Sequence, residues 1–332
     1  GKVAALVGAR PEDVIFTSGG TEANGLALAA PPGSEPGRAF LSAIEHPSVL
    51  AGGRFEPEAR TVVPVTAEGV VDLDYLARIL EHHGSEGGRP FVSLMAANNE
   101  TGALQSVAEA AGIVHEAGGV LHTDAVQMAG RLPVDLGALG ADLLTLSAHK
   151  VGGPKGVGAL ILAEGAGVRP LMTGGGQEGW RRPGTENVAG IVGFGVAAEC
   201  AGKELSHMDK ITRLRDALED GVRTVAPDAV VFAQTIPRLP NTSSIAVPGL
   251  KAETLVIGLD LAGVSISAGS ACSSGKVETS HVLAAMGAAP DVARAAIRVS
   301  LGIGNSDRDI HNFLVAFGDL VKRLRKDAKE AA

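Results

Sequence analysis

A lysine stands where an apolar run of the chain ends. Lys150 closes the sequence Ser147-Ala148-His149-Lys150, which follows the apolar residues 143–146. Because strands of open α/β sheets deliver functional groups at their carboxyl ends, this position favours a working side chain. A partly desolvated lysine loses some preference for its charged form and becomes an amine nucleophile. Such an amine can hold an aldehyde cofactor, most commonly pyridoxal phosphate, as a Schiff base, although a surface lysine in a loop fits the same segment.

Three more polar side chains, His46, Asn99 and Asp124, fall just past predicted strand ends. In a parallel sheet these ends line one crevice, so we expect them to share a site with Lys150. A carboxylate such as Asp124 keeps a pyridine nitrogen protonated, and a helix cap or a buried ion pair is its alternative role. Gln127 and Asn99 can each bond the phenolic oxygen of the ring. His46 can lie over the ring and move protons, unless it is a core histidine.

The turn at residues 18–21, with the sequence Ser-Gly-Gly-Thr, is a candidate phosphate site. It leads from a predicted strand into a helix, whose N-terminus offers unpaired N–H groups to an anion. Gly20 lets the backbone approach and Thr21 adds a hydroxyl, but glycine turns of this kind are often only tight corners. The sequence matches neither a Walker loop nor a dinucleotide fingerprint.

The two cysteines stand in different contexts. We expect Cys200 to be a small buried residue of a helix. Cys272 lies among glycines, serines and alanines that cannot bury it well, and Lys276 nearby favours its thiolate. Arg298 interrupts a strand-like run, where its planar fork suits a substrate carboxylate and a buried ion pair is the alternative.

Strands and helices alternate through the first two thirds of the chain. This alternation predicts an α/β fold with a mostly parallel sheet covered by helices on both faces. The polar stretch 81–88 reads as a loop, so His82 and His83 are expected to be solvated. We expect strands at residues 14–16, 39–41, 91–95, 120–124 and 143–146, and an antiparallel return at residues 157–162.

The pattern changes at about residue 206. A helix precedes short strands and a Gly/Ser-rich segment, and a last helix begins with the capping pair Ser306 and Asp309. We therefore predict a large cofactor-binding domain at residues 1–205 and a smaller α+β domain at residues 206–332, which carries the loop of Cys272.

The composition excludes several classes of protein. Aromatic residues make up 3% of the chain and the formal net charge is −8, which argues against a nucleic-acid binder. No run approaches the roughly 20 apolar residues of a membrane span. Two cysteines cannot form a disulfide framework, so we expect a reducing compartment, the cytoplasm. The chain begins at Gly1 in what reads as a mid-domain helix, and we expect further sequence upstream.

Taken together, these segments resemble the cysteine desulfurases, which are fold-type I pyridoxal-phosphate enzymes of the class V aminotransferase group. The resemblance spans essentially the whole chain in the family's order. The matching pieces are the residues 16–24, Phe-Thr-Ser-Gly-Gly-Thr-Glu-Ala-Asn; 45–50, Glu-His-Pro-Ser-Val-Leu; 98–102, Asn-Asn-Glu-Thr-Gly; 122–127, His-Thr-Asp-Ala-Val-Gln; 147–150, Ser-Ala-His-Lys; 182–187, Arg-Pro-Gly-Thr-Glu-Asn; 269–272, Gly-Ser-Ala-Cys; and 297–302, Ile-Arg-Val-Ser-Leu-Gly.

The resemblance implies a role for each matching residue toward the cofactor. Lys150 carries it as a Schiff base, Asp124 pairs with the ring nitrogen, and His46 stacks on the ring and serves in acid–base steps. Gln127 and Asn99 bond the phenolic oxygen. The phosphate is held by Gly20, Thr21, Ser147 and His149, with Thr185 reaching it from the neighbouring subunit of a homodimer.

The resemblance also implies how the sulfur moves. Arg298, with Asn99, binds the carboxylate side of L-cysteine, and Cys272 takes the sulfur as a persulfide while alanine leaves. The Gly-Ser-Ala-Cys context is similar to the branch with a long cysteine loop. That loop presents the persulfide to an iron–sulfur scaffold or a sulfur carrier in thiolation, and Cys272 is a candidate transient ligand of an iron–sulfur cluster. No resident metal site is implied.

Two departures from the family's pattern stand out. The N-terminal segment with a Leu-Asp-x-x-Ala-Thr-Thr motif does not stand in this sequence, and Gly179-Trp180 replaces a basic residue followed by glycine. Other class V activities, an aminotransferase or a selenocysteine lyase, would use Lys150 and Asp124 equally well. A non-catalytic scaffold that binds sulfur acceptors is the alternative from another class.

Overall fold

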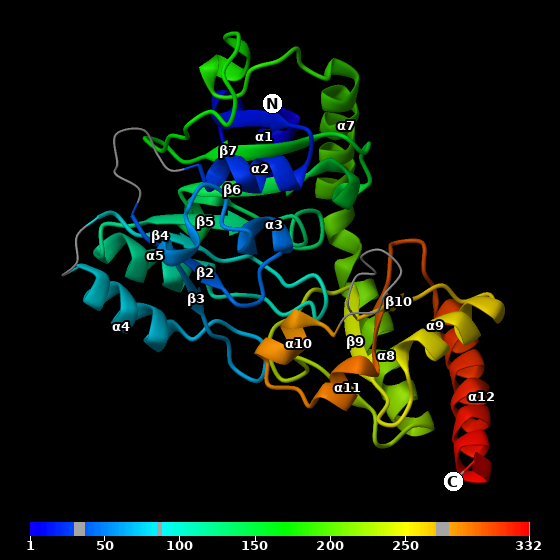
Figure 1. Cartoon of the computed structure of the whole chain (residues 1–332). Helices are drawn as coiled ribbons and strands as arrows, with labels where there is room; N and C mark the ends of the chain where they lie inside the picture. Colours follow the sequence, from blue (N-terminus) through cyan, green and yellow to red (C-terminus); the bar gives the residue numbers. More distant parts are fainter. Residues whose placement is uncertain (30–36, 85–87, 270–278, 332) are drawn as a thin grey trace. The chain divides into compact units, whose positions relative to one another are not determined.

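The computed structural model describes residues 1–29, 37–84, 88–269 and 279–331 (Figure 1). The chain folds into two compact units. The second unit includes two short segments from the part of the sequence that we assign to the large domain. The first unit consists of Gly1–Thr66, Val70–Asn98 and Gln105–Leu205, and the second of Ala67–Gly69, Asn99–Leu104 and Ser206–Ala332.

The first unit is built on a seven-stranded sheet with the order β1-β7-β6-β5-β4-β2-β3. Its neighbours from β3 to β6 are parallel, whereas β7 is antiparallel to both β6 and β1. The predicted parallel sheet and its antiparallel return are therefore confirmed. The strands are β1 (Val14–Thr17), β2 (Ala39–Ser42), β3 (Arg60–Val63), β4 (Phe91–Ser93), β5 (Val120–Asp124), β6 (Leu143–Ser147) and β7 (Gly158–Leu162).

Helices cover both faces of this sheet. Neighbouring residues of β5 face opposite sides, so Leu121 packs in a core with residues of α1, α4, α5 and α7, and Val120 packs in another with residues of α2 and α3. The α-helices are α1 (Lys2–Leu6), α2 (Gly20–Ala27), α3 (Pro47–Leu50), α4 (Leu73–Gly84), α5 (Val107–Glu116), α6 (Leu136–Leu139) and α7 (Val188–Glu204). The short 3₁₀ helices are η1 (Pro11–Asp13), η2 (Pro57–Ala59), η3 (Ala148–Val151) and η4 (Gln177–Trp180), and η5 (Leu205–His207) follows α7.

The second unit holds a four-stranded antiparallel sheet with the order β10-β11-β9-β8. The amphipathic helices α8 and α12 contribute Leu214, Leu218 and Phe317 to its core. The Ser306 backbone N–H donates to the Asp309 carboxylate at 2.8 Å, which confirms the predicted cap. The elements are β8 (Val230–Val231), β9 (Thr242–Ala246), β10 (Ser267–Ala268) and β11 (Ala296–Ser300), with α8 (Met208–Val225), α9 (Ala252–Leu261), α10 (His281–Ala285), α11 (Pro290–Arg294) and α12 (Asp307–Ala331).

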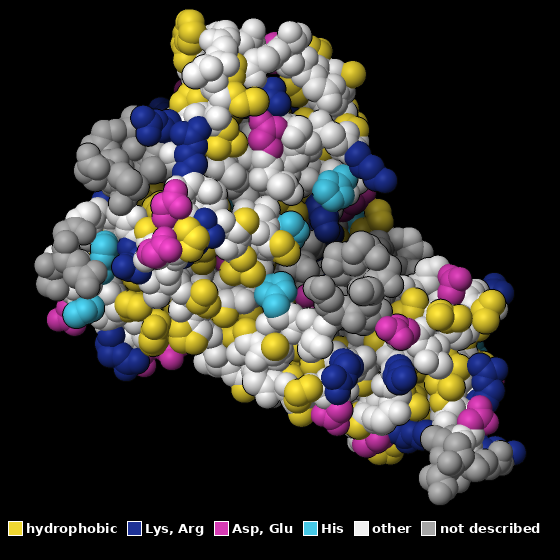
Figure 2. Space-filling model, in the orientation of Figure 1, with side chains coloured by type: hydrophobic (Ala, Val, Ile, Leu, Met, Phe, Trp, Pro, Cys, Tyr) yellow, Lys and Arg dark blue, Asp and Glu magenta, His cyan; other side chains and the backbone are white. Residues whose placement is uncertain are grey.

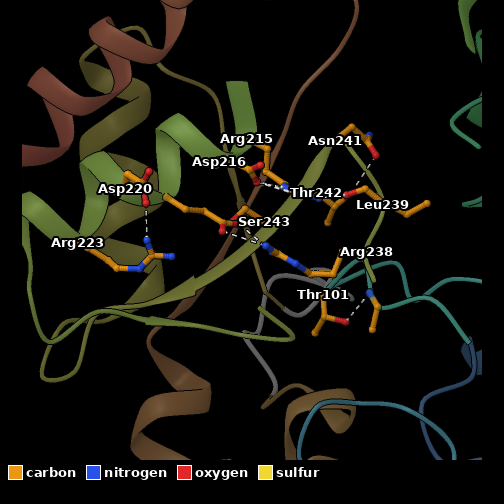
Figure 3. A network of polar contacts seen from close by, with 12 residues as sticks. Thr101, Arg215, Asp216, Asp220, Arg223, Arg238, Leu239, Asn241, Thr242 and Ser243 are labelled. Atoms are coloured by element: carbon orange, nitrogen blue, oxygen red, sulfur yellow. Dashed lines mark hydrogen bonds and ion pairs between the residues drawn. The ribbon is translucent and has the colours of Figure 1, made fainter. Parts of the chain in front are cut away.

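A buried ion pair lies in the second unit, between α8 and the start of β9 (Figure 3). The Arg238 guanidinium donates to both carboxylate oxygens of Glu219, at 2.8 and 3.0 Å, and both side chains are almost fully buried. The Ser243 hydroxyl donates to the same carboxylate at 2.7 Å. Opposite charges and a third donor thus compensate the burial of Glu219.

The expectation of a loop is wrong for residues 81–84, which end α4, and of the two histidines His82 is exposed as predicted whereas His83 is buried. Both His82 and His83 belong to the last turn of α4, and His83 is 5% exposed. Its ring meets the ring of Phe40 edge to face, with centroids 5.5 Å apart. The apolar face of the amphipathic helix continues to its end, and this places His83 in the core.

None of the helices in the described part of the chain is long and apolar enough to span a bilayer. Nor do the described residues bring three or more His, Cys, Asp or Glu side chains together in a way that would hold a metal ion. Figure 2 shows acidic and basic side chains interspersed over the face that it presents.

Candidate active site

Several strands of the first sheet end at one edge and place polar side chains there. Strands β2, β4, β5 and β6 are mutually parallel, so their carboxyl ends lie on the same side. Asp124 is the last residue of β5, and Lys150 lies in η3 directly after β6. His46 follows the end of β2 and serves as the N-cap of α3.

Asp124 is the buried acid of this edge, with 8% of its surface exposed. Its Oδ2 accepts a hydrogen bond from Asn24 Nδ2 at 2.8 Å, and its Oδ1 accepts one from the Val126 backbone N–H at 3.0 Å. Burial raises the pKa of Asp124, whereas these two donors and the positive charges of His46 and Lys150 lower it. The imidazole of His46 and the amine of Lys150 are therefore both close enough to act on the Asp124 carboxylate electrostatically.

His46 is held by its own helix. The ring Nδ1 accepts the Ser48 backbone N–H at 3.1 Å and lies 2.7 Å from the Ser48 hydroxyl. Asn24 Nδ2 reaches that hydroxyl at 2.9 Å, so a chain of polar contacts runs from His46 to Asp124. Asn24 and Ser48 stand inside motifs of the sequence, but their residue types alone gave no reason to connect them.

A third residue missed from the sequence is Glu45, which precedes His46. It is fully buried, and its Oε1 accepts the Met95 backbone N–H at 2.6 Å. Burial raises the pKa of Glu45 to about 8, and the negative charge of Asp124 adds to the increase. Burial thus favours the protonated form of Glu45, one residue before His46 in the chain.

The segment that carries Lys150 is tied to the segment after β5. Arg131 donates to the Gln127 carbonyl at 2.7 Å and to the Lys150 carbonyl at 3.2 Å. Both Lys150 and Gln127 are half-buried. One guanidinium therefore fixes the backbone at two of the predicted site residues, and the side chains of Gln127 and Lys150 extend from a common support.

The predicted phosphate residues of the first unit come together where α2 begins. A Cβ built on Gly20 would lie 3.4 Å from the Ser147 Cβ, so the helix N-terminus and the end of β6 are in close contact. The Ser147 hydroxyl lies 2.9 Å from His149 Nδ1. Burial lowers the pKa of His149, and the nearby charges of Lys150 and Lys155 lower it further. Together with exposed Thr21, these groups can offer N–H and hydroxyl donors to a phosphate.

Thr185 is exposed in the stretch before α7. It lines a hollow with Thr17, Ser18 and Arg182, and neither Asp124 nor Lys150 borders that hollow. Arg182 forms an ion pair with Glu22 of α2 at 2.8 Å, which ties this stretch to α2 within the first unit.

Asn99 and Arg298 belong to the second unit. Arg298 Nη1 donates to the Asn99 carbonyl at 2.9 Å. Among the described residues, its buried Nε has no hydrogen-bond partner, so the fork retains a donor that a carboxylate could use. Burial lowers the pKa of Arg298, and the charge of Glu100 opposes that decrease.

The two cysteines differ from expectation in one respect. Cys200 is exposed on α7, so the prediction of a buried residue is wrong. Helix α7 buries Ala197, Ala198 and Ala201 and leaves the intervening face to solvent. Cys272 lies outside the described residues.

Comparison with known proteins places this arrangement in a family. The model of the class V aminotransferases matches residues 1–313. The chain belongs to the class V aminotransferase family. It is 43% identical to a cysteine desulfurase of Sinorhizobium fredii, over 97% of this chain and 84% of that protein. It is 39% identical to the cysteine desulfurase IscS of Dictyoglomus turgidum, over 98% of this chain and 83% of that protein.

The fold agrees with this family assignment. The NifS-like protein from Rickettsia africae superimposes with a TM-score of 0.87 at 36% identity, over 97% of this chain and 86% of that chain. The predicted resemblance to the cysteine desulfurases is thereby confirmed. Membership of this group of class V proteins implies an enzyme that works with pyridoxal phosphate.

Proposed function

We propose that this protein is a cysteine desulfurase that converts L-cysteine to L-alanine and takes up the sulfur on Cys272 as a persulfide. The observation that carries the proposal is the buried Asp124, on which the charges of Lys150 and His46 both act. The relatives named cysteine desulfurase support it independently, because they match nearly the whole chain.

The residues at the sheet edge fit pyridoxal phosphate. Asp124 is a buried carboxylate whose hydrogen-bond donors are all neutral, and among the described residues it forms no ion pair. Such a group favours a cationic N–H, which a protonated pyridine supplies. The hydroxyl of Ser147, the imidazole of His149 and the N-terminus of α2 form a donor set of the kind that binds phosphate.

When bound, pyridoxal phosphate supplies an aldehyde that captures amines and a ring that accepts the electrons of an adjacent carbanion. In this proposal Lys150 Nζ holds the cofactor and, once released, moves the proton at Cα of cysteine. Asp124 keeps the ring nitrogen protonated. His46 covers the ring and moves protons, and Gln127 and Asn99 hold the phenolic oxygen.

The remaining contacts orient the bound molecules. Gly20, Thr21, Ser147 and His149 hold the phosphate, and Thr185 of the partner subunit completes this set. Arg298, a residue of the second unit, binds the carboxylate of the substrate through its planar guanidinium group. Each of these roles places a charged or polar group of the chain against a complementary group of the ligand.

The transfer of sulfur from the substrate to Cys272 needs no external oxidant. The Cys272 thiolate attacks the sulfur of the substrate, an S–S bond forms, and the C–S bond breaks. The carbon released from sulfur gains a proton and leaves as the methyl group of alanine. The persulfide then passes to an iron–sulfur scaffold or a sulfur carrier, and a reducing compartment such as the cytoplasm keeps Cys272 a thiol between turnovers.

An apolar stripe supports the homodimer. Val188, Val192 and Val196 are spaced four residues apart on α7 and are 65%, 61% and 52% exposed. Large apolar side chains aligned on one face of a helix favour burial against another surface. The stripe begins at Val188, three residues after Thr185. A second copy of the chain that packs on the stripe would therefore lie next to Thr185, the residue that we propose reaches the phosphate of the partner subunit.

The activity is tested by incubating the protein with pyridoxal phosphate, a thiol reductant and L-cysteine. We expect alanine and sulfide in equal amounts, and a loss of about 100-fold or more in Cys272→Ser. Cys200→Ser is the matched control, because it removes the other thiol and should keep full activity. Normal desulfuration by Cys272→Ser would refute the assigned nucleophile, and amino-group transfer to a keto acid without sulfide would show an aminotransferase instead.

A further inference from the structure

The polar chain between His46 and Asp124 lies entirely in the first unit. It consists of two residues, Asn24 on α2 and Ser48 on α3, that the proposed chemistry leaves without a role. Asn24 is 1% exposed and Ser48 is half-buried. We propose that Asn24 and Ser48 are positioning residues that hold the proton of His46 on Nε2 and tie the imidazole to Asp124. The benefit to catalysis rests on the proposed function, but the proton position itself does not.

The carboxylate of Asp124 fixes the orientation of the Asn24 amide. Asn24 Nδ2 lies 2.8 Å from Asp124 Oδ2, and the opposite orientation would place two acceptor oxygens against each other. The same nitrogen lies 2.9 Å from the Ser48 hydroxyl oxygen. The two amide hydrogens therefore go to Asp124 and Ser48, one to each.

The direction of the next hydrogen bond follows from this. Because the Ser48 oxygen accepts from Asn24, its own hydrogen is available to His46 Nδ1, 2.7 Å away. The Ser48 backbone N–H points at the same nitrogen from 3.1 Å. Two donors directed at Nδ1 require its lone pair, so a neutral His46 carries its proton on Nε2.

This arrangement determines what His46 can do in the reaction. With Nδ1 used inside the fold, the mobile proton is the one on Nε2. A neutral His46 therefore acts first as a hydrogen-bond donor at Nε2, toward whatever lies on that side of the ring. Asn24 Nδ2 donates both to the Asp124 carboxylate and to the Ser48 hydroxyl. One amide therefore holds the carboxylate and orients the hydroxyl.

The proton position can be measured on the protein without cofactor, by two-bond ¹H–¹⁵N NMR of ¹⁵N-histidine-labelled protein at about two pH units above the ordinary pKa of histidine. His46→Gln assigns the His46 signals. We expect the pattern of an Nε2–H tautomer in the wild type, a partial shift toward a mixture of tautomers in Ser48→Ala, which loses the hydroxyl but keeps the backbone N–H, and return to the wild-type pattern in Ser48→Thr. Ser106→Ala, which removes a hydroxyl that makes no cap bond, should leave the pattern unchanged.

Kinetics of the loaded enzyme provide the second readout. We expect Ser48→Ala to lower kcat by about 5- to 10-fold with little change in KM, because one neutral hydrogen bond is lost, and Ser48→Thr to restore kcat. An Nδ1–H pattern in the wild type, or an unchanged pattern in Ser48→Ala, would overturn the inference. A protein that shows the expected NMR patterns but no desulfuration would instead refute the proposed function and leave the positioning intact.

Discussion

Two buried carboxylates, one in each unit, are held by different kinds of donor. Glu219 in the second unit receives both arms of Arg238 and the hydroxyl of Ser243 (Figure 3). Among the described residues, Asp124 in the first unit receives only the Asn24 amide and the Val126 backbone N–H. The first carboxylate is matched by a fixed positive charge, whereas the second has neutral donors and only more distant cations.

The difference separates a carboxylate bound in an ion pair from one that we propose to bind the cofactor. Removing one partner of a buried ion pair leaves a charge without compensation, so Glu219 and Arg238 depend on each other for stability. The donors to Asp124 are neutral, so the charge of its carboxylate is only partly compensated, and burial raises its pKa. An incompletely compensated acid in the fold is ready for a cationic ligand, and the same chemical change should therefore have different consequences at the two sites.

The largest effect is expected from Glu219→Gln. The substitution keeps the shape of the side chain but leaves the Arg238 guanidinium buried without its counter-charge. We expect the free energy of unfolding to fall by about 3–5 kcal/mol, measured by urea denaturation. A loss below about 1 kcal/mol would show that this pair is not a stabilising element and would remove the contrast with Asp124.

Glu45 is also a buried carboxyl of the first unit, and its contribution to stability depends on pH. Its pKa is raised to about 8, so between about pH 4.5 and 8 the folded protein holds a proton that the unfolded chain has lost. The contribution of Glu45 to stability is therefore present at low pH and is lost as the pH rises through that window, by an amount on the order of a few kcal/mol.

Glu45→Gln removes this titration. We expect the difference in unfolding free energy between the variant and the wild type to grow in favour of the variant from pH 5 to 8 (roughly the window of the shift). Urea unfolding of the cofactor-free proteins at several pH values measures it. A difference that stays constant with pH would mean that Glu45 is ionised in the folded protein at all of them.

Asp124→Asn should change stability little and function greatly. Losing one of two neutral hydrogen bonds and relieving the burial of a charge oppose each other, so we expect the cofactor-free protein to stay within about 1 kcal/mol of the wild type. Desulfuration should fall by about 100-fold or more, because the ring nitrogen loses its carboxylate. If Asp124→Asn destabilises the protein as much as Glu219→Gln, Asp124 is a structural residue.

The smallest effect is expected at an exposed ion pair of the second unit. Arg325 donates to both oxygens of Asp228 at 2.5 and 2.8 Å, and Arg325 lowers the pKa of Asp228. Solvent and salt screen this pair, so Arg325→Ala should cost about 0–1 kcal/mol in the same urea experiment. A cost as large as that of Glu219→Gln would show that burial does not decide the value of an ion pair in this unit.

The sequence predicts much of the fold because its signals are local. Apolar runs that lead into Asp124 and Lys150 predicted two strands, and both residues lie at or just after the strand ends as expected. Burial of individual side chains was less predictable. Cys200 and His83 each lie on a helix, where the face that packs is decided by neighbouring elements, and both were assigned to the wrong environment.

The residues that support the site could not be derived in this way. Asn24, Ser48 and Glu45 act through contacts between α2, α3 and the sheet, and no sequence spacing encodes those distances. The segment Asn99–Leu104 belongs to the second unit although it follows a strand of the first. The unit to which such a short segment belongs depends on tertiary packing, and the periodicity of the sequence does not indicate it.

We propose above all that Lys150 holds the cofactor beside Asp124. Borohydride reduction of the protein loaded with pyridoxal phosphate fixes the bond between the lysine and the cofactor, and mass spectrometry of the digested protein then locates it. We predict modification at Lys150 and not at Lys155, five residues further on in the same glycine-rich segment. Modification at Lys155, or at no lysine of this segment, would contradict the account.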